Sequence, residues 1–228
     1  MEAVVLAGGF GTRLRALVSD VPKPMAPVVG RPFLEIVLRG LARNGFHRVI
    51  LAVGYMAETI SSHFGSAFAG MSLAYQVEES PLGTGGAVRA ALCECFEDHA
   101  FVFNGDTYLD LEVQQVEAQW RRHGDPIIVA RAVPDLARYG ALLVEGGAVT
   151  GFLEKGAVGA GLINAGCYVL PRDILDKYPV GVAFSLEKDF LADSVVSRRF
   201  VVFEARGLFI DIGVPEDYRR AQTLLAGL

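Results

Sequence analysis

Apolar runs of strand length alternate with amphipathic stretches of helix length through the first half of the chain. Strands are predicted from the apolar runs at 3–7, 49–53, 72–77 and 100–103. Helices are predicted from the stretches at 33–44, 56–64 and 84–93. This βαβα order predicts an α/β protein with a Rossmann-like, mostly parallel central sheet, whose buried strands are covered by helices on both faces.

The pattern changes after Gly124, where short apolar runs are separated by Gly-Gly and Pro-Asp turns. Further strands are predicted at 126–132, 140–144, 149–153, 163–170, 200–204 and 208–210. Helices are predicted at 171–177, 186–192 and 215–225. These runs predict a smaller, partly antiparallel layer. Because no linker is rich in Pro, Gly or Ser, we expect one domain over residues 1–228, with halves of about 1–124 and 125–228.

The composition favours an ordered protein that does not bind nucleic acid. Hydrophobic residues make up 52% of the chain, and the formal net charge is -5. A nucleic-acid-binding protein normally carries a basic face instead. No apolar run reaches the ~18 residues that span a bilayer, and the N-terminal run is typical of a strand rather than of a signal segment. We therefore expect no membrane partner and a cytoplasmic location.

The cysteines and histidines show no spacing typical of a metal or redox site. Cys93, Cys95 and Cys167 are expected to be buried thiols of a reducing compartment. The four histidines lie near the ends of predicted elements, where we expect them to be exposed or to cap an element.

The first predicted strand leads into a glycine-rich loop that is followed by two cations. Gly8, Gly9 and Gly11 carry no Cβ, so the backbone N–H groups of this loop can approach phosphate oxygens closely. Arg13 offers a planar guanidinium group, and Lys23, between two prolines, offers a compact charge. The pattern predicts a nucleoside triphosphate site. The alternative is a tight strand-to-helix turn with surface cations.

Two other glycine-loop motifs match this stretch poorly. A Walker loop ends in Gly-Lys-Ser or Gly-Lys-Thr, but Gly11 is followed by Thr12 and Arg13. A dinucleotide-binding loop has a third glycine where this chain has Leu14, and an acidic residue after the second strand, where this chain has Gly54. The first interpretation fails and the second is weak.

Carboxylates follow several predicted strands. Asp106 comes directly after an apolar strand, where it suits Mg²⁺, a hard ion that prefers oxygen ligands; the alternative is a helix or turn cap. Asp211 also ends a short apolar run, so it is either a second ligand or a turn residue. Asp110 lies too far from Asp106 to complete a DxD motif.

The turn from Glu78 into Gly83 and Thr84 can present a carboxylate and backbone groups to a flat base. Guanine has adjacent N1–H and N2–H₂ donors that one carboxylate accepts together, whereas uracil and thymine have one ring N–H. Guanine is therefore favoured over uracil and thymine, and the alternative is an ordinary capping loop without a ligand. Because ligands in open α/β sheets lie beyond the carboxyl ends of the strands, we expect this turn, Asp106 and the glycine loop to share one site.

Taken together, the segments 6–14, 22–25, 81–87, 104–106 and 154–155 resemble those of the sugar-1-phosphate nucleotidyltransferases, and the resemblance covers nearly the whole chain. It is greatest to the guanylyltransferases of the family, and it implies a GT-A-like nucleotidyltransferase fold. The implied substrates are GTP, or another nucleoside triphosphate, and a sugar 1-phosphate, foremost a manno-configured heptose 1-phosphate or mannose 1-phosphate. The implied product is a nucleotide sugar for a capsule or lipopolysaccharide, and exposed apolar residues in the second half are compatible with a homodimer.

The resemblance also implies roles for individual residues. Arg13 and Lys23 would be catalytic, and Asp106 and Asp211 would bind Mg²⁺. The nucleotide would be bound by Leu6, Ala7, Gly8, Gly9, Gly11, Thr12, Glu78, Gly83, Thr84 and Asp106. The sugar phosphate would be bound by Asn104, Gly140, Glu154, Lys155 and Asn164.

Alternatives to these residue roles and to this activity stay open. Glu154 and Lys155 are typical of surface charge, and Asn164 is also typical of a bulge. The same scaffold can serve as a regulatory subunit that binds a nucleotide sugar without catalysis, although the cationic and acidic site residues are present here. A glycosyltransferase is disfavoured by the missing DxD motif.

Overall fold

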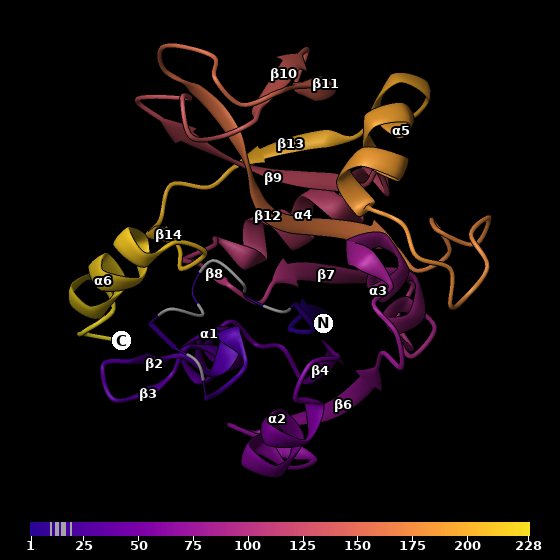
Figure 1. The fold of residues 1–228 in the computed structure, drawn as a ribbon. Helices are drawn as coiled ribbons and strands as arrows, with labels where there is room; N and C mark the ends of the chain where they lie inside the picture. The colour runs from indigo at the N-terminus through magenta and orange to yellow at the C-terminus, as the bar shows by residue number, and fades with distance from the viewer. Residues whose placement is uncertain (10, 12–13, 15–16, 19) are drawn as a thin grey trace.

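The strands of both halves of the chain join one mixed sheet (Figure 1). The computed structural model describes residues 1–9, 11, 14, 17–18 and 20–228. Within these residues the sheet has ten strands, in the order β10-β11-β13-β9-β12-β7-β1-β4-β6-β5. The predicted α/β class is confirmed, and the partly antiparallel strands of the second half extend the central sheet.

The strands of the sheet lie close to the predicted runs. In chain order they are β1 (Glu2–Leu6), β4 (Arg48–Val53), β5 (Ala67–Phe68), β6 (Met71–Val77), β7 (His99–Asn104), β9 (Ile127–Val133), β10 (Ala141–Glu145), β11 (Ala148–Leu153), β12 (Gly161–Pro171) and β13 (Val201–Glu204). Two short ribbons lie outside the sheet. They pair β2 (Pro27–Val28) with β3 (Arg31–Pro32), and β8 (Thr107–Leu109) with β14 (Phe209–Asp211).

The centre of the sheet is parallel and buried on both faces. β1 pairs in parallel with β4 and with β7, and β4 pairs in parallel with β6. Successive residues of β1 enter opposite cores, because Val4 and Val5, both fully buried, belong to different hydrophobic clusters. β12 runs antiparallel to both β7 and β9, and it thereby joins the two halves of the chain.

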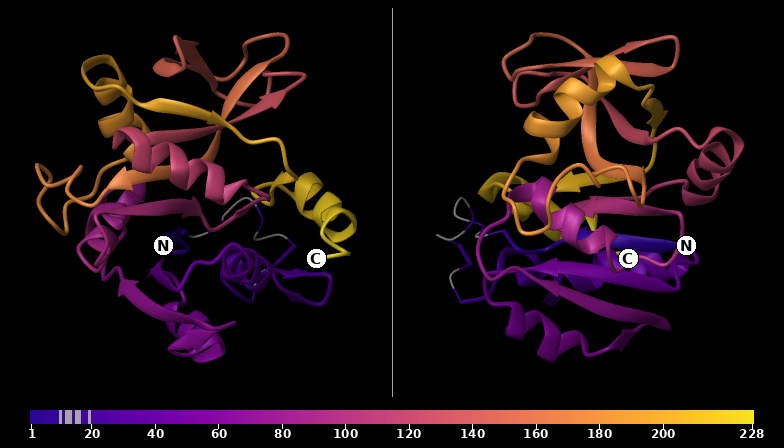
Figure 2. Two further views of the ribbon diagram at one scale, coloured as in Figure 1. Left: turned by 180° about the vertical axis from the view of Figure 1, so that it is seen from behind. Right: turned by 90° about the vertical axis from the view of Figure 1, so that its right-hand side faces the viewer.

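Helices cover both faces of this sheet (Figure 2). One core is closed by α1 (Phe33–Arg43), α2 (Ala57–Phe64), α4 (Val113–His123) and α6 (Pro215–Leu224). The other core is closed by α3 (Gly83–Leu92), the π-helix η2 (Leu186–Leu191) and α5 (Ala192–Ser197). A single 3₁₀ turn, η1 (Lys23–Met25), precedes β2.

The predicted helix over 171–177 is wrong, because Pro171 belongs to β12 and residues 172–177 form turns. β12 continues through Pro171, which pairs with His99, and the next N–H, that of Arg172, donates to the Asp98 carbonyl at 2.8 Å. The sheet therefore holds the residues with which a helix would begin.

His99 is buried, contrary to its predicted exposure. Its Nδ1 lies 2.5 Å from Asp98 Oδ1 and its Nε2 lies 2.8 Å from Glu117 Oε2. Its ring stacks on Trp120 at 4.8 Å between centroids. The hydrogen bond from His99 lowers the pKa of Asp98. Position in the sequence did not reveal this, because Glu117 and Trp120 come from α4.

Two of the three cysteines are buried as predicted, whereas Cys93 is exposed. Burial raises the pKa of Cys95 to about 12 and that of Cys167 well above its usual value. Both buried thiols therefore stay protonated and unreactive. Cys93 is the residue after α3, and Arg89 donates to its sulfur at 3.1 Å.

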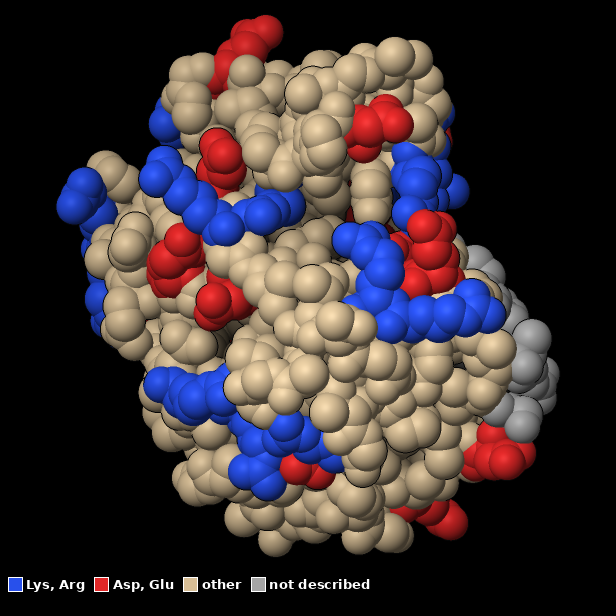
Figure 3. Space-filling model, turned by 90° about the vertical axis from the view of Figure 1, so that its left-hand side faces the viewer, with Lys and Arg blue, Asp and Glu red and all other residues tan. Residues whose placement is uncertain are grey.

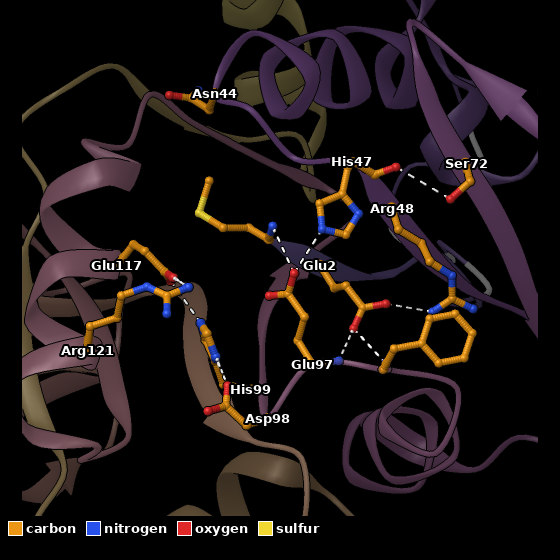
Figure 4. Close-up of polar contacts among 12 residues, drawn as sticks. Glu2, Asn44, His47, Arg48, Ser72, Glu97, Asp98, His99, Glu117 and Arg121 are labelled. Atoms are coloured by element: carbon orange, nitrogen blue, oxygen red, sulfur yellow. Dashed lines mark hydrogen bonds and ion pairs between the residues drawn. The ribbon is translucent and has the colours of Figure 1, made fainter.

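A polar network lies at the amino ends of the parallel strands, opposite the edge where a ligand is expected (Figure 4). Glu2, which is 1% exposed, accepts from Arg48 at 2.8 Å and from the N–H groups of Phe96 and Glu97 at 2.7 Å each. The N-terminal amino group of Met1 forms an ion pair with Glu97. Glu2 thus joins the starts of β1 and β4 to the segment before β7.

We expect Glu2→Ala to lower the free energy of unfolding by about 3 kcal/mol, because it leaves a guanidinium group and two backbone N–H groups without their acceptor. Urea denaturation measures the loss. In the control His47→Ala an exposed ring is removed from the same network, and the expected change stays within about 0.5 kcal/mol. Equal losses in the two variants would contradict a special role for Glu2.

Among the described residues on the face that carries α6, charged side chains of both signs are interspersed, with no broad patch of one sign (Figure 3). Among the described residues no helix is both long and apolar enough to pass through a membrane.

Candidate active site

A cavity of about 340 Å³ lies at the carboxyl ends of the parallel strands. Its walls come from β1, β4 and β7, from the loops after β1, β6 and β7, and from η1 and α3. The lining residues are Leu6, Gly8, Gly9, Lys23, Pro24, Ala52, Glu78, Pro81, Gly83, Thr84, Ala87, Asn104 and Asp106. The expectation that the glycine loop, the Glu78 turn and Asp106 share one site is thus met in the geometry. The volume is within the range of small-molecule sites.

Two glycines of the loop after β1, Gly8 and Gly11, are required by close neighbours, whereas a Cβ on Gly9 would meet nothing within 4 Å. A Cβ on Gly8 would lie 2.9 Å from Glu78 Oε1 and 3.1 Å from Gly54 N. A Cβ on Gly11, whose φ is +59°, would lie 2.7 Å from the Cβ of Lys23. Ala7 is buried, and its N–H donates to the Ala52 carbonyl at 2.8 Å. The loop is therefore held against both β4 and the lysine turn. Thr12 and Arg13 lie outside the described residues.

Lys23 is the cation placed directly in the cavity wall. It begins η1, and its ammonium group forms an ion pair with Asp106. The Lys23 side chain is 10% exposed, whereas that of Asp106 is 31% exposed. Asp106 therefore keeps access to solvent or a ligand while it compensates the lysine charge.

Asp211 lies beside Asp106 because β14 pairs with β8. Asp211 is opposite Thr107 in that ribbon, and the N–H of Ile212 donates to the Asp106 carbonyl at 2.9 Å. A Cβ on Gly213 would lie 2.8 Å from Asp211 Oδ1 and 3.2 Å from Lys23 Nζ. Two carboxylates and one ammonium group thus meet at this rim. Among the described residues no third His, Cys, Asp or Glu completes a metal-binding cluster with them.

Glu78 follows β6 and separates the main cavity from a smaller one of about 220 Å³. Its Oε2 accepts from the N–H of Leu82 at 3.0 Å, and its own N–H donates to the Val53 carbonyl at 2.8 Å. The carboxylate is therefore fixed between β4 and the turn that leads into α3.

The glycines at the start of α3 make room for a distant segment of the chain. A Cβ on Gly83, whose φ is +66°, would lie 2.6 Å from the Phe184 carbonyl oxygen. A Cβ on Gly86 would lie 2.6 Å from the Val182 carbonyl oxygen, and the N–H of Gly85 donates to Phe184 at 2.9 Å. Gly83 lines the cavity, but its lack of a side chain is also needed for packing. No pattern in the sequence indicated that residues 182–184 pack here.

The predicted sugar-phosphate residues of the second half lie in β12 or next to the ends of β10 and β11. Ala141 pairs with Leu153 of β11 and with Ile163 of β12. The next positions along these strands are Gly140, Glu154 and Asn164.

The exposed residue Lys155 follows in the turn after β11. Gly140, Glu154, Lys155 and Asn164 do not line the 340 Å³ cavity.

Asn104 connects the cavity with the second half. It ends β7 and lines the cavity, and its Nδ2 would lie 2.5 Å from a Cβ on Gly166 of β12, whose φ is +69°. Gly166 lies in the register shift of β12 between Asn164 and Cys167. Sequence reasoning missed Ala52 and Ala87 in the wall, because small apolar residues carry no chemical signal.

A mixed α/β sheet with a glycine loop, a lysine and two carboxylates at its carboxyl edge defines a phosphate-handling enzyme class, and sequence comparison agrees. The chain belongs to the nucleotidyl transferase family, whose model matches residues 2–226.

Several members are similar over nearly the whole chain. The identity is 38% to the D-glycero-alpha-D-manno-heptose 1-phosphate guanylyltransferase of Aneurinibacillus thermoaerophilus, covering 97% of each chain. It is 39% to the protein of the same name from Campylobacter jejuni, covering 96% of this chain and 97% of that protein. The mannose-1-phosphate guanylyltransferase of Mycobacterium tuberculosis is 36% identical, but only 63% of its length is covered.

The crystal structure of HddC from Yersinia pseudotuberculosis in complex with GMP-PN has the same fold. It superposes with a TM-score of 0.88 at 36% identity, covering 98% of this chain and 99% of that one.

Proposed function

We propose that the protein transfers GMP from GTP to a sugar 1-phosphate, foremost D-glycero-α-D-manno-heptose 1-phosphate, and releases pyrophosphate. The observation that carries this proposal is the end-to-end similarity to two heptose 1-phosphate guanylyltransferases, with 97% of each relative covered. Mannose 1-phosphate is the second candidate acceptor. It is less favoured because the chain spans under two thirds of the mannose-specific relative.

In this proposal the first half, about 1–124, binds the nucleotide. The backbone of the glycine loop and Arg13 hold the triphosphate, since N–H groups and a guanidinium group both suit phosphate oxygens. Glu78 receives the N1–H and N2–H₂ donors of guanine, and its anchoring by Leu82 supports this role because it fixes the carboxylate direction. Gly83 and Thr84 border the same cavity.

Asp106 and Asp211 fit a magnesium ion. Both offer hard oxygen ligands at one rim, and Mg²⁺ is commonly held by one or two carboxylates together with substrate phosphates. The ion would supply charge neutralisation at the phosphates. The ion pair of Lys23 with Asp106 shows that this rim already compensates a cation.

The second half, about 125–228, would bind the sugar phosphate through Gly140, Glu154, Lys155 and Asn164, with Asn104 at the junction. A phosphate oxygen of the sugar 1-phosphate would attack the α-phosphorus of GTP in line, and the bond to pyrophosphate would break. No protein nucleophile is required. Lys23 and Arg13 would stabilise the charge that develops on the phosphoryl oxygens, and the pockets would align the reactants.

The test is pyrophosphate release with ATP, GTP, CTP, UTP or dTTP, each combined with heptose 1-phosphate, mannose 1-phosphate or glucose 1-phosphate. We expect GTP to be used at least ~10²-fold more efficiently than UTP, because guanine offers the Glu78 carboxylate two adjacent N–H donors where uracil offers one. Preference for UTP or dTTP would contradict the base assignment. No pyrophosphate release in this assay, together with release of a nucleoside diphosphate from an added nucleotide sugar, would indicate a glycosyltransferase. No release from folded protein would favour a binding-only regulatory subunit.

A further inference from the structure

A chain of hydrogen bonds connects the wall of the cavity with the second half of the molecule. It begins at Thr84, in the first turn of α3, whose hydroxyl donates to Glu187 Oε2 at 2.7 Å. The same Thr84 oxygen accepts from the N–H of Leu186 at 2.9 Å, and Ser185 donates to Glu187 Oε2 at 3.1 Å. Glu187 of η2 thereby fixes a residue that lines the proposed nucleotide side.

The other oxygen of Glu187 continues the chain into β12. The Tyr168 hydroxyl donates to Glu187 Oε1 at 3.4 Å and accepts from Asn164 Nδ2 at 2.8 Å. Tyr168 is 0% exposed. Its burial, followed by the charge of Glu187, raises its pKa well above the usual value, so the hydroxyl keeps its proton and can donate.

The carboxylate determines the direction of every bond in this chain. An ionised Glu187 can only accept, so Thr84, Ser185 and Tyr168 must all donate to it. Because the Tyr168 hydroxyl donates its one hydrogen to Glu187, its oxygen must accept from the amide NH₂ of Asn164. The amide oxygen of Asn164 then faces the N–H of Gly166, which donates to it at 3.0 Å.

We propose that Glu187 is a positioning residue that couples the two substrate sides, because one carboxylate orients Thr84 at the cavity and, through Tyr168, the amide of Asn164 in β12. The inference rests on the proposed function only in taking Thr84 for the nucleotide side and Asn164 for the sugar-phosphate side. When one substrate binds, it stabilises the arrangement of these hydrogen bonds that the other substrate's side needs. Each substrate therefore raises the affinity of the protein for the other substrate.

Glu187→Gln tests the coupling, because the NH₂ group of the glutamine side chain is a donor at a position where the hydrogen-bond chain requires an acceptor. Rates are measured over a grid of GTP and sugar 1-phosphate concentrations. In the wild type we expect saturation with one substrate to lower the KM of the other about five-fold, within the usual range of coupling between sites. In Glu187→Gln this factor should approach one, and both KM values should rise by more than kcat falls.

Tyr168→Phe separates the branch from Glu187 to Thr84 from the branch from Glu187 to Asn164. It removes the hydroxyl that links Glu187 to Asn164 and leaves the hydrogen bond between Glu187 and Thr84. It should raise the KM of the sugar 1-phosphate while the KM of GTP stays within about two-fold. The control is Tyr178→Phe, which removes a phenol hydroxyl that donates to the Asp189 carbonyl at 2.8 Å, outside the chain. The control should match the wild type. Unchanged coupling in Glu187→Gln, or changes confined to kcat, would overturn the proposal.

A binding measurement keeps this test independent of the proposed reaction. Calorimetric titration with a non-hydrolysable GTP analogue, with and without sugar 1-phosphate, needs no turnover. Coupled binding in the wild type that is lost in Glu187→Gln would support the inference even if no guanylyl transfer occurred. Transfer with independent binding of the two ligands would overturn the inference and leave the proposed function intact.

Discussion

Replacing Lys23 by alanine is expected to lower turnover by ~10²-fold or more, the usual cost of removing a preorganised charge from a transition-state site. Lys23 lies in the cavity wall, is almost buried and forms an ion pair with Asp106. The ammonium group would stabilise negative charge that develops on the phosphoryl oxygens. The loss should therefore be larger in kcat than in the binding of GTP.

The fold should tolerate this change. Alanine keeps the Cβ that packs against Gly11, and Asp106 is 31% exposed, so water can solvate it after the lysine is removed. The control is Lys177→Ala, in which an exposed lysine distant from the cavity is removed. Pyrophosphate release and thermal unfolding are measured for both variants. A folded Lys23→Ala protein with nearly normal turnover would contradict the mechanism.

Asp106→Asn should be comparably damaging, with an expected loss of ~10²-fold or more in turnover. Asparagine has nearly the same shape but no charge, so it weakens both the proposed magnesium site and the ion pair with Lys23. Because Asp211 remains on the neighbouring strand, we expect residual activity that needs a higher magnesium concentration. Turnover is therefore measured as a function of magnesium concentration.

The matched control is Asp110→Asn. It removes an exposed carboxylate four positions further along the chain, outside the 340 Å³ cavity. Its activity should stay within about two-fold of the wild type, as is usual for surface changes away from special features. EDTA should abolish the activity of the wild type, and added magnesium should restore it. Activity that persists in EDTA would contradict the magnesium site.

The sequence alone determined the layers and the edge that carries the site. Apolar runs of strand length and amphipathic helices alternate in the first half, and the parallel strands that they form are buried on both faces. Because the carboxyl ends of parallel strands meet at one edge, residues after β1, β6 and β7 were expected to come together, and they line one cavity. Local periodicity carries this information.

The pairing of strands and the contacts between residues far apart in the sequence could not be predicted from the sequence. The residues 171–177 have a helical pattern, but β12 continues through Pro171 to pair with His99, and residues 172–177 form turns. His99 and Cys93 were each assigned the wrong exposure because burial depends on neighbours from other elements. Local propensity is a weak prior when a sheet competes for the same residues.

Tertiary structure also decided how the candidate site is supported. Only the pairing of β14 with β8 places Asp211 beside Asp106, and only the packing of 182–184 on α3 explains Gly85 and Gly86. In the hydrogen-bond chain from Thr84 to Asn164, Glu187 bonds to residues 103 and 19 positions away in the sequence, Thr84 and Tyr168. The sequence by itself thus determined which chemistry faces the carboxyl edge, whereas the fold decided which side chains hold it in place, because hydrogen bonds and packing act between neighbours in space.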